Sequence, residues 1–368
     1  MVKSISARER APGVQPVDLA DVPYVDELLI RLGVGRFDPT TVGSVLGRND
    51  NWVGTTAGGT PVFVKRLTEG DRAVRMRRTE TICAAARGRL DTPRLIGTDP
   101  DHALLVFEYL PSAETGADLA ADDSFDETLC DRIGSALAAV HGLDAEGFDT
   151  SEHPLPPVAN LDALPLRYYT QASAAELAMW RLLHADAPLA QALRELRSSD
   201  VERTPSRTPI HGDVRLDQFL LADGTLYVTD FEESRMGDPA RDIGAFAGEW
   251  LYQAAAAIPL TLADASPLGH TATHEEIIAT GVVEIEQRSP NVRHFFRSYL
   301  DAAPTPVAED KELGVRAAAY AGWHMLDRML ATAARSATLS PITKAAAGIG
   351  RTVLLSPADF TSSLGLEA

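Results

Sequence analysis

Residues 210–221 read IHGDVRLDQFLL, and after a short turn residues 226–232 read LYVTDFE. In each stretch an apolar run breaks at an acidic residue, Asp213 in the first and Asp230 in the second. The turn at residues 222–224 predicts a hairpin that holds the two acids close together. Two such carboxylates can position a hydroxyl and a metal-bound phosphate, which are the requirements of phosphoryl transfer.

Length and composition predict a globular protein with two lobes. The chain has 368 residues, which is more than one compact core usually holds. Its hydrophobic content of 45% and charged content of 23% are ordinary for a folded protein. The formal net charge of -18 argues against nucleic acid as a partner, because no basic surface is broad enough to neutralise a phosphate backbone.

The targeting features predict a cytoplasmic protein without a membrane partner. The first thirty residues contain no basic segment followed by an apolar one, so no export signal is expected. No uninterrupted apolar run approaches the roughly 20 residues of a membrane span. The two cysteines, Cys83 and Cys130, match no metal-site spacing and are interpreted as buried thiols in a reducing compartment.

The first third of the chain predicts a small lobe built on an antiparallel sheet. Residues 1–17 are polar with scattered proline and glycine, and we expect a flexible tail there. The lobe itself is assigned to residues 18–110. Its expected helices cover residues 22–32 and 72–89, and its expected strands cover residues 41–46, 52–56, 61–65, 93–97 and 103–111.

Residues 111–368 predict a larger, mainly helical lobe. Helical patterns cover residues 127–140 and about 168–197, and alanine-rich helical segments dominate from residue 242 onward. Prolines predict interruptions of these later helices near residues 259, 267, 290 and 304–306. The fold class is therefore α+β, and a ligand is expected in the cleft between the lobes.

The motif His211-Gly212-Asp213, followed by Gln218 and Asp230, resembles the aminoglycoside phosphotransferase (choline-kinase-like) family. That family is a branch of the protein-kinase-like fold. The resemblance implies ATP and Mg²⁺ as cofactors, Asp213 as the catalytic residue and Asp230 as a metal ligand. Most members carry Asn where this chain carries Gln218, which keeps an amide oxygen for the metal but moves it by one methylene.

Lys65 ends the third predicted strand, and in kinase-like folds a lysine there contacts the ATP phosphates and pairs with a helix glutamate. Glu80, on the next predicted helix, is the expected partner. Glu69 is also near in sequence and stays an alternative. The resemblance therefore implies that Lys65 and Glu80 belong to the cofactor-binding residues.

Two further segments are expected to contact ATP. The turn at residues 47–54 contains Asn49 and Asn51, and asparagine and glycine tolerate the positive φ angles of a tight phosphate-covering turn. A plain hairpin turn is the alternative interpretation of this segment. Glu108 and Leu110 occupy the family's hinge, where main-chain groups hydrogen-bond the adenine.

Some residues near these motifs are expected to have structural roles. His211 and Asp242 are expected to brace the catalytic loop, and Asp242 also to cap the helix that follows. A basic group on the helix predicted at residues 72–89 is expected to be a solvated face, with phosphate or acidic-peptide binding as the alternative. This group consists of Arg72, Arg75, Arg77 and Arg78.

The phosphate acceptor is approached through a second resemblance. Residues 47–56, GRNDNWVGTT, together with the helix near residues 28–33, look like the kinase subunits of class V lanthipeptide and thioamitide biosynthesis. Those subunits phosphorylate Ser or Thr of a ribosomal precursor peptide, and a separate lyase subunit then eliminates the phosphate to give dehydroamino acids. The alternatives are a small-molecule kinase for an aminoglycoside, maltose or another sugar or amino alcohol, and a pseudokinase that binds without turnover.

Overall fold

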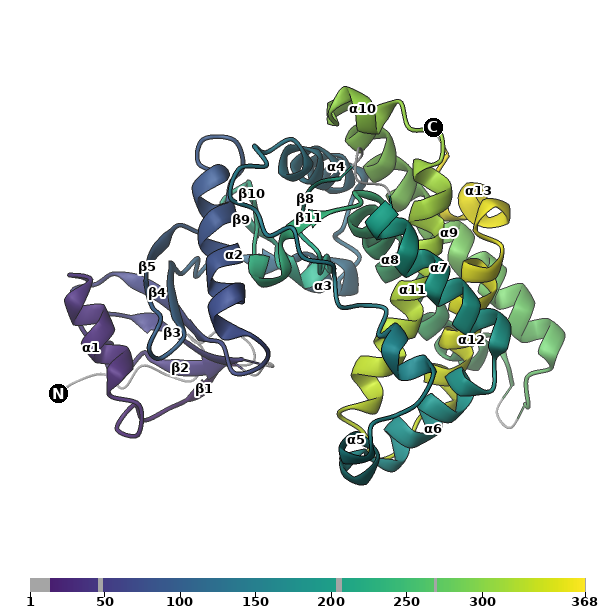
Figure 1. Ribbon diagram of the computed structural model, residues 1–368, viewed down its shortest axis with the longest axis horizontal. Helices are drawn as coiled ribbons and strands as arrows, with labels where there is room; N and C mark the ends of the chain where they lie inside the picture. The colour runs from purple at the N-terminus through teal and green to yellow at the C-terminus, as the bar shows by residue number, and fades with distance from the viewer. Residues whose placement is uncertain (1–13, 46–48, 203–206, 268–269, 368) are drawn as a thin grey trace. The chain divides into compact units, whose positions relative to one another are not determined.

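The computed structural model describes residues 14–45, 49–202, 207–267 and 270–367. These residues form two compact units. The sheet unit comprises Met1–Thr115 as far as described, together with Phe219–Glu233, and the helical unit comprises Gly116–Gln218 and Ser234–Ala368. One unit is built on an antiparallel sheet and the other is mostly helical (Figure 1), so the predicted α+β class is confirmed.

A six-stranded antiparallel sheet forms the centre of the sheet unit, in the order β1-β2-β3-β4-β6-β5. The predicted meander and the two later strands are present. A sixth strand, β1, lies within residues 1–17, the segment expected to be a flexible tail, and it pairs with β2. Residues 1–13 of that segment lie outside the described residues. The strands are β1 Val14–Pro16, β2 Gly43–Val45, β3 Asp50–Thr55, β4 Pro61–Arg66, β5 Leu95–Asp99 and β6 Leu104–Glu108.

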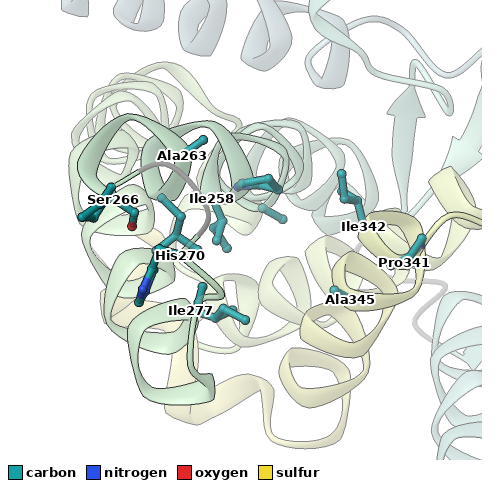
Figure 2. A pocket seen from close by; sticks show the side chains of 13 residues that line it. Ile258, Ala263, Ser266, His270, Ile277, Pro341, Ile342 and Ala345 are labelled. Carbon is teal, nitrogen blue, oxygen red and sulfur yellow. The ribbon is translucent and has the colours of Figure 1, made fainter.

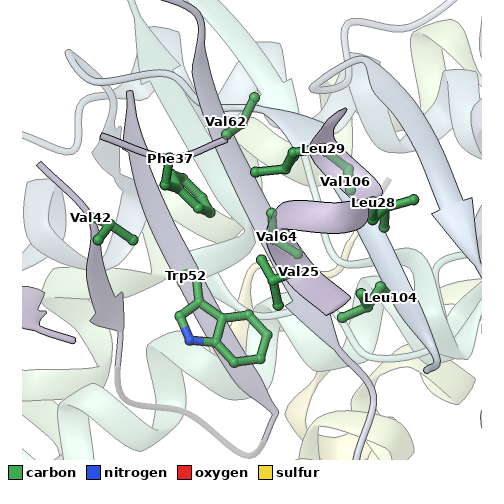
Figure 3. Packing of buried hydrophobic residues seen from close by; sticks show 10 residues of the cluster. All are labelled: Val25, Leu28, Leu29, Phe37, Val42, Trp52, Val62, Val64, Leu104 and Val106. Atoms are coloured by element: carbon green, nitrogen blue, oxygen red, sulfur yellow. The ribbon is translucent and has the colours of Figure 1, made fainter. Parts of the chain in front are cut away.

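Helix α1 (Tyr24–Arg31) covers one face of this sheet. Its buried side chains pack against alternate residues of the strands, as the twofold side-chain period of a strand requires (Figure 3). On β4, Val62 and Val64 point into this core, so Lys65 points to the opposite face. The core consists of Val25, Leu28, Leu29, Phe37, Val42, Trp52, Val62, Val64, Leu104 and Val106.

Helix α2 (Arg72–Ala85) lies on the face to which Lys65 points. Its first turn is capped by Asp71, whose side chain accepts a hydrogen bond from the Val74 N–H. Met76 of α2 packs in a second apolar cluster with Leu105, the residue directly opposite Lys65 in the ladder between β4 and β6. The side chain of Lys65 therefore lies on the same face of the sheet as α2.

The central hairpin of the chain belongs to the sheet unit, whereas the sequence assigns it with the rest of residues 111–368 to the helical lobe. Strands β9 (Phe219–Ala222) and β10 (Thr225–Val228) pair as expected, and β7 (Glu114–Thr115) adds a third strand. The turn is built by Asp223 and Gly224, both at positive φ. A short 3-10 helix, η4 (Phe231–Glu233), follows, so Asp230 lies at the junction between strand and helix.

The helical unit contains the remaining elements. Strands β8 (Thr208–Ile210) and β11 (Arg235–Gly237) pair within it, with the 3-10 turns η1 (Val158–Leu161), η3 (Leu216–Gln218) and η5 (Pro357–Phe360). The helical region predicted at residues 168–197 is divided among three helices. The helices are α3 Gly116–Ala121, α4 Glu127–His141, α5 Leu166–Gln171, α6 Ala174–His184, α7 Ala187–Glu202, α8 Ala240–Ala265, α9 His274–Ala302, α10 Thr305–Ala308, α11 Leu313–Ala333, α12 Pro341–Leu355 and α13 Thr361–Leu364.

Two of the predicted helix interruptions are wrong. Pro259 lies inside α8 and Pro290 lies inside α9, whereas the breaks near residues 267 and 304 are present. A proline inside a helix removes one backbone hydrogen bond and costs about 3 kcal/mol. In α9 the neighbouring Val292 and Phe295 are buried, and this packing offsets the local cost.

The central helices α8 and α11 approach closely at Gly244. A Cβ at this position would lie 2.3 Å from the Ala317 carbonyl oxygen and 2.4 Å from the Tyr320 Cβ. We expect Gly244→Ala to lower the free energy of unfolding by about 1–3 kcal/mol, because the added methyl forces the two helices apart. Urea denaturation measures this, with Gly348→Ala on the exposed face of α12 as the control.

Nothing lies within 4 Å of a Cβ built at Gly348. There the same change removes only backbone freedom, and we expect a gain of about 0.5–1 kcal/mol. A Gly244→Ala chain as stable as the unchanged protein would contradict the close packing of α8 on α11.

The helices and the two cysteines bear on the predictions about membrane spans and thiols. Within the described ranges no helix is both long and apolar enough to cross a membrane. Cys83 and Cys130 are free and buried, as predicted. Burial raises the pKa of each thiol to about 12, which keeps both protonated and unreactive near neutral pH.

Candidate functional site

Lys65 is the centre of the charged cluster in the sheet unit. Its ammonium pairs with the carboxylates of Asp230 and Glu232, and the distance to Glu232 Oε2 is 2.8 Å. Burial acts to lower the pKa of Lys65, but the two carboxylates outweigh it and raise the pKa above its ordinary value. The lysine is therefore held as a fixed, charged group.

Asp230 is held in a strained backbone conformation. Its φ is +66°, in the left-handed region that non-glycine residues rarely adopt, at a cost of about 1–2 kcal/mol. The carboxylate pairs with Lys65 while the side chain keeps 29% of its surface exposed. Strain that the fold maintains at an acidic residue is typical of a functional position.

Glu232 connects Lys65 to helix α2 and to the start of β3. Its Oε1 accepts a hydrogen bond of 2.6 Å from Arg75 Nη2, and its Oε2 accepts one of 3.1 Å from Asn49 Nδ2. The residue is 6% exposed, so its carboxylate has lost most of its contact with water, and these hydrogen bonds compensate for that loss. Reasoning from the sequence did not single out Glu232, although it lies two residues after Asp230.

The basic group on α2 is only partly a solvated face. Arg72 and Arg77 are exposed as predicted. Arg75 is buried against Glu232, and Arg78 Nη1 lies 3.2 Å from Glu233 Oε2, so for these two residues the prediction is wrong. The arginine-rich sequence of α2 was the available signal that this helix faces acidic partners.

The predicted pairing of Lys65 with Glu80 is not the one observed. Glu80 Oε1 accepts a hydrogen bond of 2.8 Å from Thr98 Oγ1. The alternative, Glu69, contributes its main-chain oxygen to Arg75 Nη1 at 3.1 Å. The acids that meet Lys65 come instead from the segment after β10.

The predicted phosphate-covering turn is partly described. Residues 46–48 lie outside the described residues. Asn49 is buried, and besides its bond to Glu232 its Oδ1 accepts from the Thr68 N–H at 3.2 Å. Asn51 lies directly opposite Lys65 in the β3–β4 ladder, and its Nδ2 donates to the Asn49 carbonyl at 3.1 Å. Asn49 thus ties the described end of this segment to Glu232 and Thr68, and Asn51 holds Asn49.

Of the predicted hinge residues, Glu108 ends β6 and Leu110 follows it. The Glu108 N–H donates to the Arg94 carbonyl at 3.0 Å, and its side chain accepts from the Arg94 N–H at 2.9 Å. The Leu110 carbonyl accepts from the Ala113 N–H at 3.1 Å. Because adenine recognition at a hinge uses main-chain groups, their assignment stays a prediction.

In the helical unit, Asp242 braces the loop that contains Asp213. Its carboxylate accepts hydrogen bonds from the main-chain N–H groups of His211 at 2.6 Å and Gly212 at 2.9 Å. His141 Nε2 lies 3.1 Å from the same carboxylate. The predicted brace is confirmed. The predicted helix cap is wrong, since the Ala240 N–H donates to Asp238.

Asp213 lies on this braced loop with 30% of its side chain exposed. Its Oδ2 accepts from Arg215 Nη1 at 3.2 Å, and the same guanidinium donates to both oxygens of Asp217 at 3.0 and 3.1 Å. His211, fully buried, accepts from the Asp213 N–H at 3.4 Å. The loop therefore presents one carboxylate from a fixed main chain.

Gln218 ends the same loop, and its amide oxygen faces inward. Gln218 Oε1 accepts from the Arg215 N–H at 3.1 Å, and the residue is 3% exposed. A carbonyl oxygen has two lone pairs, so this bond does not exclude a metal ligand role.

Asp230 and Gln218 are the predicted metal ligands. Among the described residues no group of three or more His, Cys, Asp or Glu side chains could hold a metal ion by itself. Mg²⁺ commonly takes one or two protein oxygens and completes its shell with phosphates and water. The carboxylate of Asp230 and the amide oxygen of Gln218 are each an oxygen donor of that kind. Their assignment as metal ligands stays a prediction.

The loop is also held by a buried histidine, which predicts a dependence of stability on pH. His153 Nε2 donates to the Gly212 carbonyl at 3.1 Å. Burial, with the charges of Arg241 and Arg235, lowers its pKa well below the ordinary 6.5. The unfolded chain therefore binds a proton below pH 6.5 that the folded chain does not, so the free energy of unfolding falls as the pH falls.

We expect His153→Gln to lose less stability on acidification than the unchanged chain. The difference should be at most about 1.4 kcal/mol for each pH unit below 6.5, because one pKa unit corresponds to 1.36 kcal/mol. Denaturant titrations at pH 6.5 and at about pH 5 measure it, and the exposed His184, changed to Gln, is the control. Parallel curves for the His153→Gln chain and the unchanged chain would contradict this assignment.

A separate apolar groove lies in the helical unit between the end of α8, the start of α9 and the start of α12 (Figure 2). Its volume is about 570 Å³, and Ile258, Ile277 and Ile342 are among its lining residues. Among the described residues that line it, none is acidic. The groove therefore lacks the groups that phosphoryl transfer requires.

Comparisons with known proteins agree with the geometry. The sequence model of the phosphotransferase enzyme family matches residues 45–269. The amicoumacin kinase hAmiN, solved with AMP-PNP, Ca²⁺ and Ami, is similar in structure, with a TM-score of 0.53, 16% identity and coverage of 92% of this chain and 95% of that one. An ethanolamine kinase from Plasmodium vivax gives a TM-score of 0.51, 14% identity and coverage of 97% and 93%. Among curated proteins no match was found.

Proposed function

Since the chain belongs to the phosphotransferase enzyme family, we propose that it transfers the γ-phosphate of ATP to a hydroxyl in the presence of Mg²⁺. The observation that carries the proposal is the pair of prepared carboxylates, Asp230 against Lys65 and Asp213 on a loop braced by Asp242. Each carboxylate is partly exposed and held by buried neighbours, as a reacting group requires.

On the nucleotide side, Lys65 contacts the ATP phosphates. Asp230 and Gln218 would hold Mg²⁺, which would neutralise negative charge on the phosphates. The turn with Asn49 and Asn51 covers the phosphates through its main chain. The hinge residues Glu108 and Leu110 contact the adenine. Glu80, whose carboxylate bonds Thr98, has no role in this proposed site.

On the acceptor side, Asp213 orients the hydroxyl and receives its proton. A bond forms between the acceptor oxygen and the γ-phosphorus, and the bond from that phosphorus to the bridging oxygen of ADP breaks. The proton of the hydroxyl moves to the Asp213 carboxylate, and ADP leaves with the electron pair of the broken bond. Asp242 and His211 fix the main chain that presents Asp213.

The acceptor we propose is a Ser or Thr of a ribosomal precursor peptide, with a separate lyase that eliminates the phosphate. The support is the resemblance of residues 47–56 to the kinase subunits of lanthipeptide and thioamitide biosynthesis. The test is mass spectrometry of a precursor peptide encoded by a neighbouring gene after incubation with Mg-ATP and the full chain. A mass increase of one phosphoryl group on Ser or Thr is the expected result.

A small-molecule hydroxyl is the second candidate. Two proteins of similar structure favour it, because they are described as kinases of amicoumacin and of ethanolamine. A chain with a net charge of -18 also suits a cationic acceptor electrostatically. ADP release with an aminoglycoside, an amino alcohol or a sugar, without phosphorylation of the peptide, would replace the peptide proposal by this one.

A further inference from the structure

We propose that Glu232 is the residue that positions Lys65 for the nucleotide phosphates, and that helix α2 supports it through Arg75 instead of supplying an acid itself. This inference rests on the proposed function, because it assigns a role within the same nucleotide site. The carboxylate that orients Lys65 comes from the segment after β10 and not from helix α2.

Both oxygens of Glu232 are used by the protein. Oε2 lies 2.8 Å from Lys65 Nζ and accepts from Asn49 Nδ2 at 3.1 Å, while Oε1 accepts from Arg75 Nη2 at 2.6 Å. The side chains of Lys65, Arg75 and Glu232 are 12%, 7% and 8% exposed. A carboxylate that is shielded and saturated by protein donors is suited to positioning and poorly suited to binding a metal.

The other carboxylate on Lys65 has a different task. Asp230 is 29% exposed, more than three times as much as Glu232, and it is the proposed metal ligand. When its oxygens bind a metal, its charge is no longer fully available to the lysine. Glu232 then remains as the acid that keeps Lys65 in place.

Two arginines of α2 pair with the acids of η4. Arg75 Nη2 bonds Glu232, and Arg75 Nε lies 3.2 Å from Glu233 Oε1, so one guanidinium holds two successive acids of η4. Arg78 reinforces the contact through Glu233. An acid on α2 at the position of Arg75 would repel Glu232, whereas the arginine attracts it.

The decisive comparison is between Glu232→Gln and Glu80→Gln in the full chain. Each change removes one negative charge without altering the side chain's size. We expect Glu232→Gln to raise the KM for ATP by about 10-fold or more, the effect of losing one ion pair with the lysine. Glu80→Gln should stay within about 2-fold of the unchanged chain, because Glu80 bonds Thr98.

Two further variants separate positioning from general damage to the fold. Arg75→Gln is expected to raise the KM for ATP in the same direction as Glu232→Gln, and Arg75→Lys to restore part of it. In the chain that already carries Lys65→Gln, adding Glu232→Gln should cause no further loss of ATP affinity. A merely structural role of Glu232 would instead lower affinity again in the double variant.

The outcomes distinguish this inference from the proposed function. Equilibrium binding of ATP is measured alongside turnover. Weaker binding by the Glu232→Gln chain supports the inference even if no acceptor is phosphorylated. Unchanged binding and KM in the Glu232→Gln and Arg75→Gln chains, or a larger effect of Glu80→Gln, would overturn it while leaving the proposed function intact. A wild-type chain that binds no ATP would overturn both.

Discussion

Replacing Asp213 with alanine is expected to lower kcat by about 10²–10⁴-fold, the range for a positioned acid–base group. The carboxylate is removed from a loop whose main chain is fixed by Asp242 and His153, so the loop should keep its conformation. The KM for ATP should change little, because Lys65 and its partners lie in the other unit. Steady-state measurement of ADP release with a saturating acceptor reads both constants.

The matched control for this change is Asp217→Ala on the same loop. Asp217 accepts two hydrogen bonds from Arg215, as an exposed partner of the same guanidinium that contacts Asp213. Its removal should lower kcat far less than removal of Asp213. Equal background rates for the unchanged and Asp213→Ala chains would show a binding module without turnover, which is the pseudokinase alternative.

Asp230→Asn is expected to lower kcat by roughly 10²-fold or more, since a bound metal supplies several kcal/mol of charge stabilisation. Asparagine is the appropriate replacement because it tolerates the positive φ of this position better than alanine does. Lys65 keeps Glu232 as a partner, so the sheet unit should stay folded. Activity should respond to Mg²⁺ only at higher concentrations than in the unchanged chain.

Glu233→Gln is the control for Asp230→Asn. Glu233 is an acid of the same segment, and it faces Arg75 and Arg78 instead of Lys65. Its replacement should leave the magnesium dependence of the rate unchanged. If both variants shift that dependence equally, the metal does not depend on Asp230 in particular.

Much of the fold could be predicted because it depends on local patterns. The hairpin of β9 and β10 follows from two apolar runs around Asp223 and Gly224, and the two strands pair as expected. Alternation of side chains on β4 places Lys65 opposite to Val64 in the same way. The brace by Asp242 was also within reach, since it acts on a loop in the same unit.

The partners of Lys65 could not be predicted, because they lie far from it in sequence. Asp230 follows Lys65 by 165 positions and Glu232 by 167. The nearest helix acid, Glu80, was the natural choice when only the order of elements was known. The choice depended on tertiary packing, which turns Glu80 toward Thr98 and brings Glu232 to Lys65. The proline rule failed at Pro259 and Pro290 for a similar reason, since helix packing outweighed a local preference.

The inclusion of Phe219–Glu233 in the sheet unit has a consequence for biosynthesis. The ribosome completes residues 1–115 long before it reaches this segment. In the nascent chain β7 has no β9 to pair with, and Lys65 and Arg75 have none of the acids that neutralise them in the finished protein. A chain that ends at residue 115 therefore retains Lys65 and Arg75 without these carboxylates, and we expect its sheet to be less stable than in the full chain.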